Sequence, residues 1–170
     1  MILHTTRDDH RIAWLTALAI TIHIAESALP SPLPGVKPGL ANVVTVLALL
    51  QFGWSTAAWI TGLRVVVGSL LLGTFLSPAF ILSLSGAMAS IITLGLAWRL
   101  SGMLPGRGLG AVGYSVLAAM AHMAGQFYAA YALFIPHPAL FHLLPVLMTA
   151  AVIFGIVSGV IAQMTLHRIR

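Results

Sequence analysis

The sequence contains no cysteine and only three acidic residues among its 170 positions. Without cysteine there is no disulfide, no thiolate-ligated iron–sulfur cluster and no thioether-attached haem. The acids are Asp8, Asp9 and Glu26, so the clustered carboxylates that hold magnesium on a diphosphate are missing. The sequence also shows no nucleophile–base–orienter set and no glycine loop joined to a Lys-Ser/Thr pair. We therefore expect no catalytic residue and no enzymatic activity in this chain alone.

Charge is scarce and apolar residues dominate. Hydrophobic residues make up 59% of the chain and charged residues 6%, with a mean hydropathy of +1.03. This balance indicates an integral membrane protein. The chain holds about six spans of roughly 20 residues each, which leaves no room for a soluble catalytic domain. Its net charge of +5 is scattered over predicted helix ends, so we expect contact with a lipid bilayer and not with nucleic acid.

Proline and glycine divide the chain into six predicted helices. We expect an all-α, polytopic membrane protein with six transmembrane helices, folded as a single integral membrane domain over residues 1–170. The helices are predicted at about 11–29, 39–53, 55–74, 79–98, 110–134 and 141–166.

The basic residues predict the orientation. With the amino terminus in the cytoplasm, six arginines near helix ends face the cytoplasm and Lys37 faces the outside. Those arginines are Arg7, Arg11, Arg99, Arg107, Arg168 and Arg170. We therefore expect a multi-pass protein of the cytoplasmic (inner) membrane with both termini cytoplasmic.

Polar residues inside the apolar helices mark the candidate site, because charge at bilayer depth is costly and is usually retained for a function. Under this orientation most of them lie in the middle or outer half of the membrane. His122 and Gln126, four residues apart, share one helix face. We expect a pocket open to the outside, with substrate-binding residues Glu26, Lys37, Asn42, Arg64, His122 and Gln126.

Several of these residues have two interpretations. Arg64 keeps its proton and needs a partner, which is either Glu26 in an internal ion pair or an anionic ligand. Lys37 is either a solvated interfacial lysine or a clamp for a ligand phosphate or carboxylate. His122 and Gln126 either complete hydrogen bonds between helices or contact the ligand.

Two further patterns bear on partners and metals. Ala13 and Ala17 form a strip of small residues on the first helix, which either packs within the chain or docks another membrane subunit. His137 and His142 are five residues apart across Pro138, which suits one helix face poorly, and we expect no metal site.

Several blocks of the sequence follow a family signature. The first runs Glu26-x-x-Leu29-Pro30-x-Pro32-x-Pro34-Gly35-x-Lys37-x-Gly39-Leu40-Ala41-Asn42. The later blocks are Arg64-x-x-x-Gly68-Ser69-Leu70-Leu71-x-Gly73, Ser83-Leu84-Ser85-Gly86 and His122-x-x-Gly125-Gln126. Together they resemble the Gx transporter family, which is also labelled heptaprenyl diphosphate synthase component I. Pro38 departs from the pattern, since a hydrophobic residue is commoner there.

The six-helix plan is also similar to the S components of energy-coupling factor (ECF) transporters. The resemblance implies a subunit that binds a vitamin or cofactor near the outer face. It also implies docking through small residues of the first helix, here Ala13 and Ala17, onto a transmembrane coupling subunit that works with two ATPases. We therefore expect a membrane subunit for uptake of a small anionic or amphipathic vitamin- or cofactor-like molecule.

The ligand and one alternative function stay open. Flavin, thiamine-like, quinone-precursor and diphosphate compounds all suit a basic, partly apolar pocket, and no cofactor of the chain's own is expected. The alternative is a non-transporting accessory subunit of a membrane redox or prenyl-lipid (quinone) complex. The scarcity of carboxylates conflicts with the synthase label itself.

Overall fold

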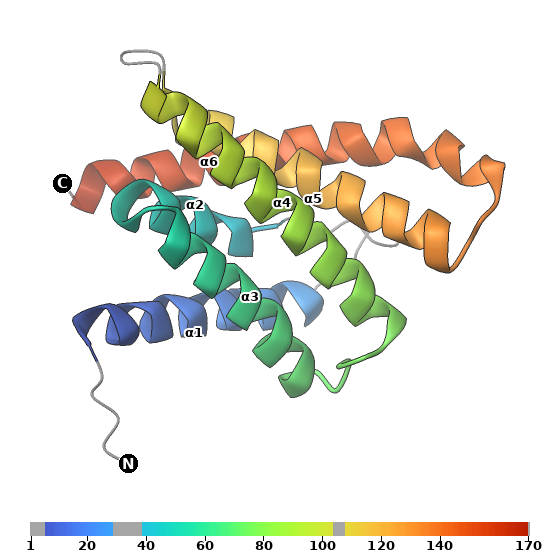
Figure 1. Cartoon of the computed structure of the whole chain (residues 1–170), viewed down its shortest axis with the longest axis horizontal. Helices are drawn as coiled ribbons and strands as arrows, with labels where there is room; N and C mark the ends of the chain where they lie inside the picture. Colours follow the sequence, from blue (N-terminus) through green and yellow to red (C-terminus); the bar gives the residue numbers. More distant parts are fainter. Residues whose placement is uncertain (1–5, 29–38, 104–107, 170) are drawn as a thin grey trace.

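The computed structural model describes residues 6–28, 39–103 and 108–169. This part of the chain is helical and contains no strand, which confirms the predicted all-α fold (Figure 1). The elements are α1 (Arg7–Ala28), α2 (Ala41–Phe52), α3 (Trp54–Leu71), α4 (Pro78–Met103), α5 (Ala111–Leu133), the 3₁₀ helix η1 (Pro138–Leu143) and α6 (Leu144–Ile169).

Three of the described helical segments are long and apolar enough to cross a membrane. They are Trp54–Leu71, Pro78–Met103 and Pro138–Arg168, while Ala41–Phe52 is apolar but shorter. A run of about 20 apolar residues spans the hydrocarbon core of a bilayer. The chain is therefore a membrane protein.

The first helix begins at Arg7, earlier than the predicted residue 11. The reason is a reciprocal cap, in which the side chains of Thr6 and Asp9 each accept a hydrogen bond from the backbone N–H of the other residue. The Thr6 backbone N–H donates to the Asp9 carboxylate at 2.8 Å, and the Asp9 backbone N–H donates to Thr6 Oγ1 at 3.3 Å. This cap satisfies donors that a helix start leaves without partners.

The turn between α3 and α4 ends the third helix at Leu71 rather than at the predicted residue 74. The Thr74 N–H donates to the Ser69 carbonyl at 2.8 Å and the Gly73 N–H to the Leu70 carbonyl at 3.2 Å. Gly73 has φ +67, a left-handed conformation that glycine adopts at low cost, and the two bonds close a Schellman motif.

The fourth helix continues to Met103, five residues past the predicted end at 98. Ser101, in this added stretch, accepts a hydrogen bond from the hydroxyl of Tyr114 at 2.9 Å. Tyr114 is 2% exposed, so this bond ties the end of α4 to the buried face of α5.

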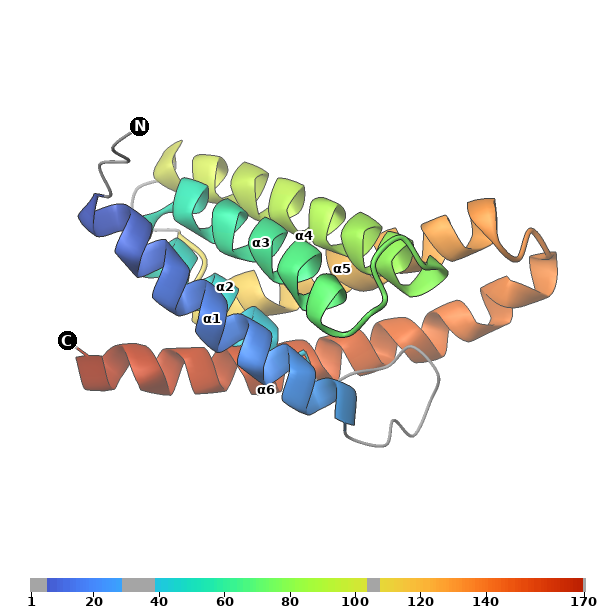
Figure 2. The same cartoon turned by 90° about the horizontal axis from the view of Figure 1, so that it is seen from below.

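The short helix α2 lies at the centre of the bundle and packs against α1, α3, α5 and α6. Figure 1 shows it between α1 and α6, and in Figure 2 α1 lies in front of most of it. Seven of its 12 residues are buried. A helix that is apolar on all sides is stable where it is enclosed by others, which accounts for a helix too short to span the membrane.

Glycines allow α4, α5 and α6 to approach closely. A Cβ on Gly86 of α4 would lie 2.8 Å from the backbone oxygen of His122, and a Cβ on Gly125 of α5 would lie 2.7 Å from the backbone oxygen of Ser85. Gly155 and Gly159 of α6 face α5 in the same way. Small residues permit such contacts between membrane helices, and these contacts fix the part of α5 that carries His122.

Candidate functional site: a polar cavity inside the bundle

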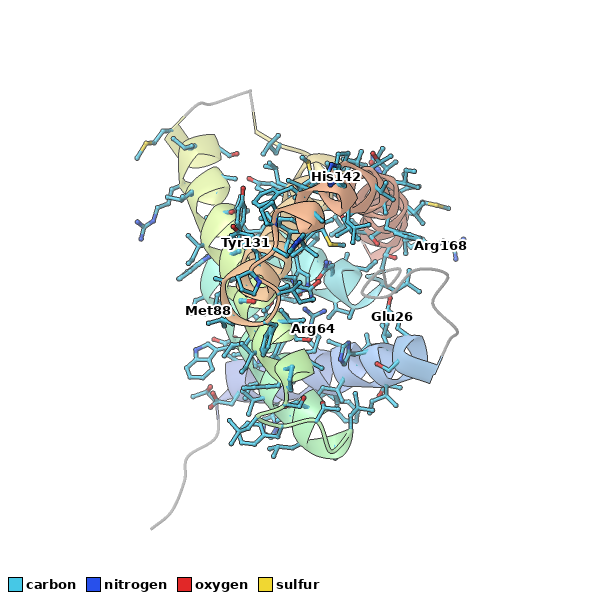
Figure 3. The ribbon with its side chains drawn as sticks, turned by 90° about the vertical axis from the view of Figure 1, so that its right-hand side faces the viewer. Glu26, Arg64, Met88, Tyr131, His142 and Arg168 are labelled. Carbon is cyan, nitrogen blue, oxygen red and sulfur yellow. The ribbon has the colours of Figure 1, made fainter. Side chains whose placement is uncertain are left out.

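A cavity of about 430 Å³ lies inside the bundle and is lined by residues of all six α-helices. Five of the six residues predicted to bind a substrate line it, although they come from distant parts of the sequence. They are Glu26 on α1, Asn42 on α2, Arg64 on α3, and His122 and Gln126 on α5. The sixth, Lys37, lies outside the described residues. Figure 3 shows Arg64 among the helices and Glu26 near the end of α1.

Arg64 is a buried cation near the middle of α3, with 6% of its surface exposed. Both terminal nitrogens of its guanidinium donate to Asn42 Oδ1, each at 3.4 Å. A guanidinium has five N–H donors and is always charged. One neutral amide oxygen at this distance uses only part of that capacity.

Glu26 is 4% exposed, and its Oε1 accepts a hydrogen bond from the backbone N–H of Leu40. Leu40 is the N-cap residue of α2. The first N–H groups of a helix lack partners within the helix, and this end carries the positive end of the helix dipole. The carboxylate therefore stabilises the start of the central helix.

The direct ion pair between Glu26 and Arg64 that the sequence suggested is not formed at contact distance between these two described residues. The ion pair found in the described part of the chain joins Arg11 to Asp8 at 3.1 Å, near the exposed start of α1. Glu26 and Arg64 still attract each other through space. The ion-pair interpretation is wrong as a contact because the amino end of α2 competes for the carboxylate.

His122 has an unsatisfied nitrogen in the wall of the cavity. Its Nδ1 is buried and has no hydrogen-bond partner among the described residues. The ring lies against α4, where a Cβ on Gly86 would come within 3.0 Å of His122 Cδ2 and 2.8 Å of Gln126 Cγ. The glycine at position 86 is thus part of what places both side chains.

The sequence reasoning missed the contribution of α6 and of the deeper part of α5. Ser115 on α5 and Ser158 on α6 line the cavity, and they are 0% and 2% exposed. Ser115 precedes His122 by seven residues, or two helical turns. This spacing was visible in the sequence, but serine is too common at helix contacts to be selected by spacing alone.

Ala13 and Ala17 are both exposed on α1, beside Trp14, which is 78% exposed. These alanines therefore do not pack inside the part of the chain that the structure describes. Within residues 6–28, 39–103 and 108–169, no group of three or more His, Asp or Glu side chains is placed to hold a metal ion.

The helical fold, the apolar helices and the polar cavity define a small integral membrane protein. A family profile described as heptaprenyl diphosphate synthase component I matches residues 15–165. The chain belongs to this family, which is the one its motifs resemble and is also called the Gx transporter family. Comparison with curated proteins and with solved structures gives no match.

Proposed function

We propose that the chain is a substrate-binding membrane subunit for uptake of a small anionic or amphipathic, vitamin- or cofactor-like molecule. The observation that carries this proposal is the gathering of Glu26, Asn42, Arg64, His122 and Gln126 around one cavity. Its volume of about 430 Å³ falls in the range typical of small-molecule sites, about 300–1,000 Å³.

The burial of Arg64 and its lack of a carboxylate at contact distance among the described residues favour an anionic ligand. A buried charge is costly unless it is paired and hydrogen-bonded. The nearest carboxylate, on Glu26, is engaged at the start of α2, and the guanidinium contacts a neutral amide at 3.4 Å. An anion in the cavity would use the remaining donors of Arg64 and place a negative charge in direct contact with the guanidinium.

The topology belongs to the proposal as well: six passes through the cytoplasmic (inner) membrane, with both termini in the cytoplasm. The start of α1 and the ends of α4 and α6 lie toward one end of the bundle (Figure 1). These helix ends carry Arg7, Arg11, Arg99 and Arg168, as the positive-inside rule requires of a cytoplasmic face. The turn between α3 and α4 lies toward the other end and contributes Thr74 to the cavity.

Transport needs a partner, because the sequence contains no motif for ATP binding. We propose a transmembrane coupling subunit with ATPases, docked on α1 at Ala13 and Ala17. Their exposure supports this role, since small side chains let another helix approach closely.

The test is native mass spectrometry of the gently purified full-length protein, compared with an Arg64→Met variant. The wild type should retain a small molecule, and the variant should lose it. Arg99→Met is the matched control, since Arg99 is an exposed arginine at the end of α4 and should leave retention unchanged. Equal retention by all three proteins would remove Arg64 from the site.

The family's description favours a second candidate function, an accessory subunit of a prenyl-lipid complex. In that case the same mass spectra would show a copurified enzyme subunit and no dependence of any small molecule on Arg64. For either function we propose that the chain itself catalyses no reaction, because its only acid outside the amino-terminal pair Asp8–Asp9 is Glu26.

A further inference from the structure

Two helices contribute charged side chains to the cavity wall, and all six contribute uncharged polar residues. The charged side chains, Glu26 and Arg64, come from α1 and α3. The part formed by α5 and α6 has uncharged residues, among them Ser115 on α5 and Phe154 and Ser158 on α6. A molecule that fills the cavity therefore meets a charge on one side and neutral hydrogen-bonding groups on the other.

Ser115 differs from most helical hydroxyl residues of this protein. Thr61, Thr149 and Thr165 each donate to the carbonyl four residues earlier in their own helix, at 2.8 Å. The Ser115 hydroxyl has no partner among the described residues, although the residue is 0% exposed. Leaving a buried hydroxyl without a partner costs about 1–3 kcal/mol.

The second unsatisfied polar atom of the wall belongs to the same helix. His122 Nδ1 is also buried without a partner in the described part of the chain, and seven residues separate it from Ser115, or about 10 Å along α5. Seven residues are close to two full turns, so both side chains lie on one face of the helix. A bound molecule with polar groups along its length would give each of them a partner.

Two glycines of α6 bring its backbone close to Ser115. Gly155 lines the cavity, and a Cβ at this position would lie 2.9 Å from Val116 Cα and 3.3 Å from the Ser115 carbonyl oxygen. Gly159, one turn further, would bring a Cβ within 3.1 Å of Ser115 Cβ. Neither glycine has a side chain that could form a hydrogen bond with the hydroxyl.

We infer that the bound molecule is an elongated anion whose uncharged body carries hydrogen-bonding oxygen or nitrogen atoms, and is not an anion with a hydrocarbon body such as an isoprenoid chain. The inference rests on the proposed function and narrows it. Arg64 holds the anionic end, and the body extends along α5 past His122 to Ser115. A hydrocarbon body would leave both unsatisfied atoms without a partner, at the full cost of their burial.

The test compares two probes with the same anionic head. Thiamine diphosphate has nitrogen-containing rings, and geranyl diphosphate has a hydrocarbon chain. Binding of each to the detergent-solubilised full chain is measured by calorimetry for the wild type and for Ser115→Ala. Thiamine diphosphate should bind the wild type more tightly, and Ser115→Ala should weaken its binding roughly 2- to 10-fold, the effect of one lost hydrogen bond. Binding of geranyl diphosphate should not change.

Thr16→Val is the matched control, because Thr16 Oγ1 is also buried without a partner among the described residues, on α1 and away from the cavity lining. In the absence of probe, both variants lose an unsatisfied hydroxyl and should melt at the same temperature as the wild type or higher. Only Ser115→Ala should weaken the binding of thiamine diphosphate.

The outcomes separate the inference from the proposed function. Tighter binding of geranyl diphosphate, or unchanged binding of thiamine diphosphate to Ser115→Ala, overturns the inference alone. Binding of neither diphosphate to the wild type overturns the proposed anion site, and the inference with it. A lower melting temperature of Ser115→Ala without probe would show that the hydroxyl is a structural donor, which also overturns the inference.

Discussion

The contact between Gly86 and Gly125 can be tested with a single methyl group. In a Gly86→Ala variant, the new Cβ would lie 2.8 Å from the backbone oxygen of His122 and 2.8 Å from Gln126 Cγ. The Gln126 side chain can turn aside, but the His122 oxygen belongs to the backbone of α5. The substitution must therefore push α4 and α5 apart.

The magnitude follows from this distance. Ordinary contacts of a Cβ begin at 3.4 Å, so the helices must separate by about 0.6 Å, and overpacking of this kind typically costs about 1–3 kcal/mol. In the corresponding variant on α5, Gly125→Ala, the new Cβ would lie 2.7 Å from the Ser85 backbone oxygen. This substitution should lower the free energy of unfolding by about as much. The double variant should cost less than the sum of the two, because one separation relieves both contacts.

Thermal unfolding followed by the fluorescence of the four tryptophans measures the stability, and retention of the copurified molecule measures the site. Gly62→Ala is the matched control, since a Cβ there meets no atom within 4 Å. We expect Gly86→Ala to melt at a lower temperature and to retain less ligand than Gly62→Ala. Equal melting temperature and equal retention of the two variants would refute this account of how α4 positions His122 and Gln126.

Two further predictions concern α1. Glu26→Gln should destabilise the protein by about 1–2 kcal/mol, because the start of α2 loses a buried charge next to its dipole, whereas Asp8→Asn at the exposed start of α1 should have little effect. Equal melting temperatures of these two variants would contradict the capping role. Ala17→Trp should block uptake in cells that contain the coupling partner but spare ligand retention by the isolated protein. Unfolding of this variant in isolation would contradict the exposed position of Ala17 on α1.

The sequence by itself determined the class of fold. Scarce charge and apolar runs long enough to cross a bilayer as helices indicated a helical membrane protein, in which each span satisfies its own backbone in lipid. Proline and glycine placed the helix boundaries within a few residues. The differences arose from local hydrogen bonds, such as the Thr6–Asp9 cap and the Schellman turn at Gly73, which depend on side-chain and backbone conformation more than on composition.

Most of the candidate site could also be predicted from the sequence, because a polar residue in an apolar membrane helix costs free energy and is usually retained for a function. Glu26, Asn42, Arg64, His122 and Gln126 were found in this way, and the structure places all five around one cavity. The same argument does not identify serines, because a serine hydroxyl in a helix usually donates a hydrogen bond to a backbone carbonyl of that helix and so needs no other partner. Only the structure distinguishes Ser115, which has no such bond among the described residues.

Only the tertiary structure decided which partner each charged side chain of the site has. Spacing along separate helices allowed Glu26 and Arg64 to meet, but it could not show that the buried amino end of α2 lies closer to the carboxylate. That position depends on how α2 packs among α1, α3, α5 and α6, through contacts between residues far apart in the chain. The surrounding helices decide how deeply a side chain is buried and which group it pairs with. That a charged side chain needs a partner when buried follows from its charge and is known from the sequence.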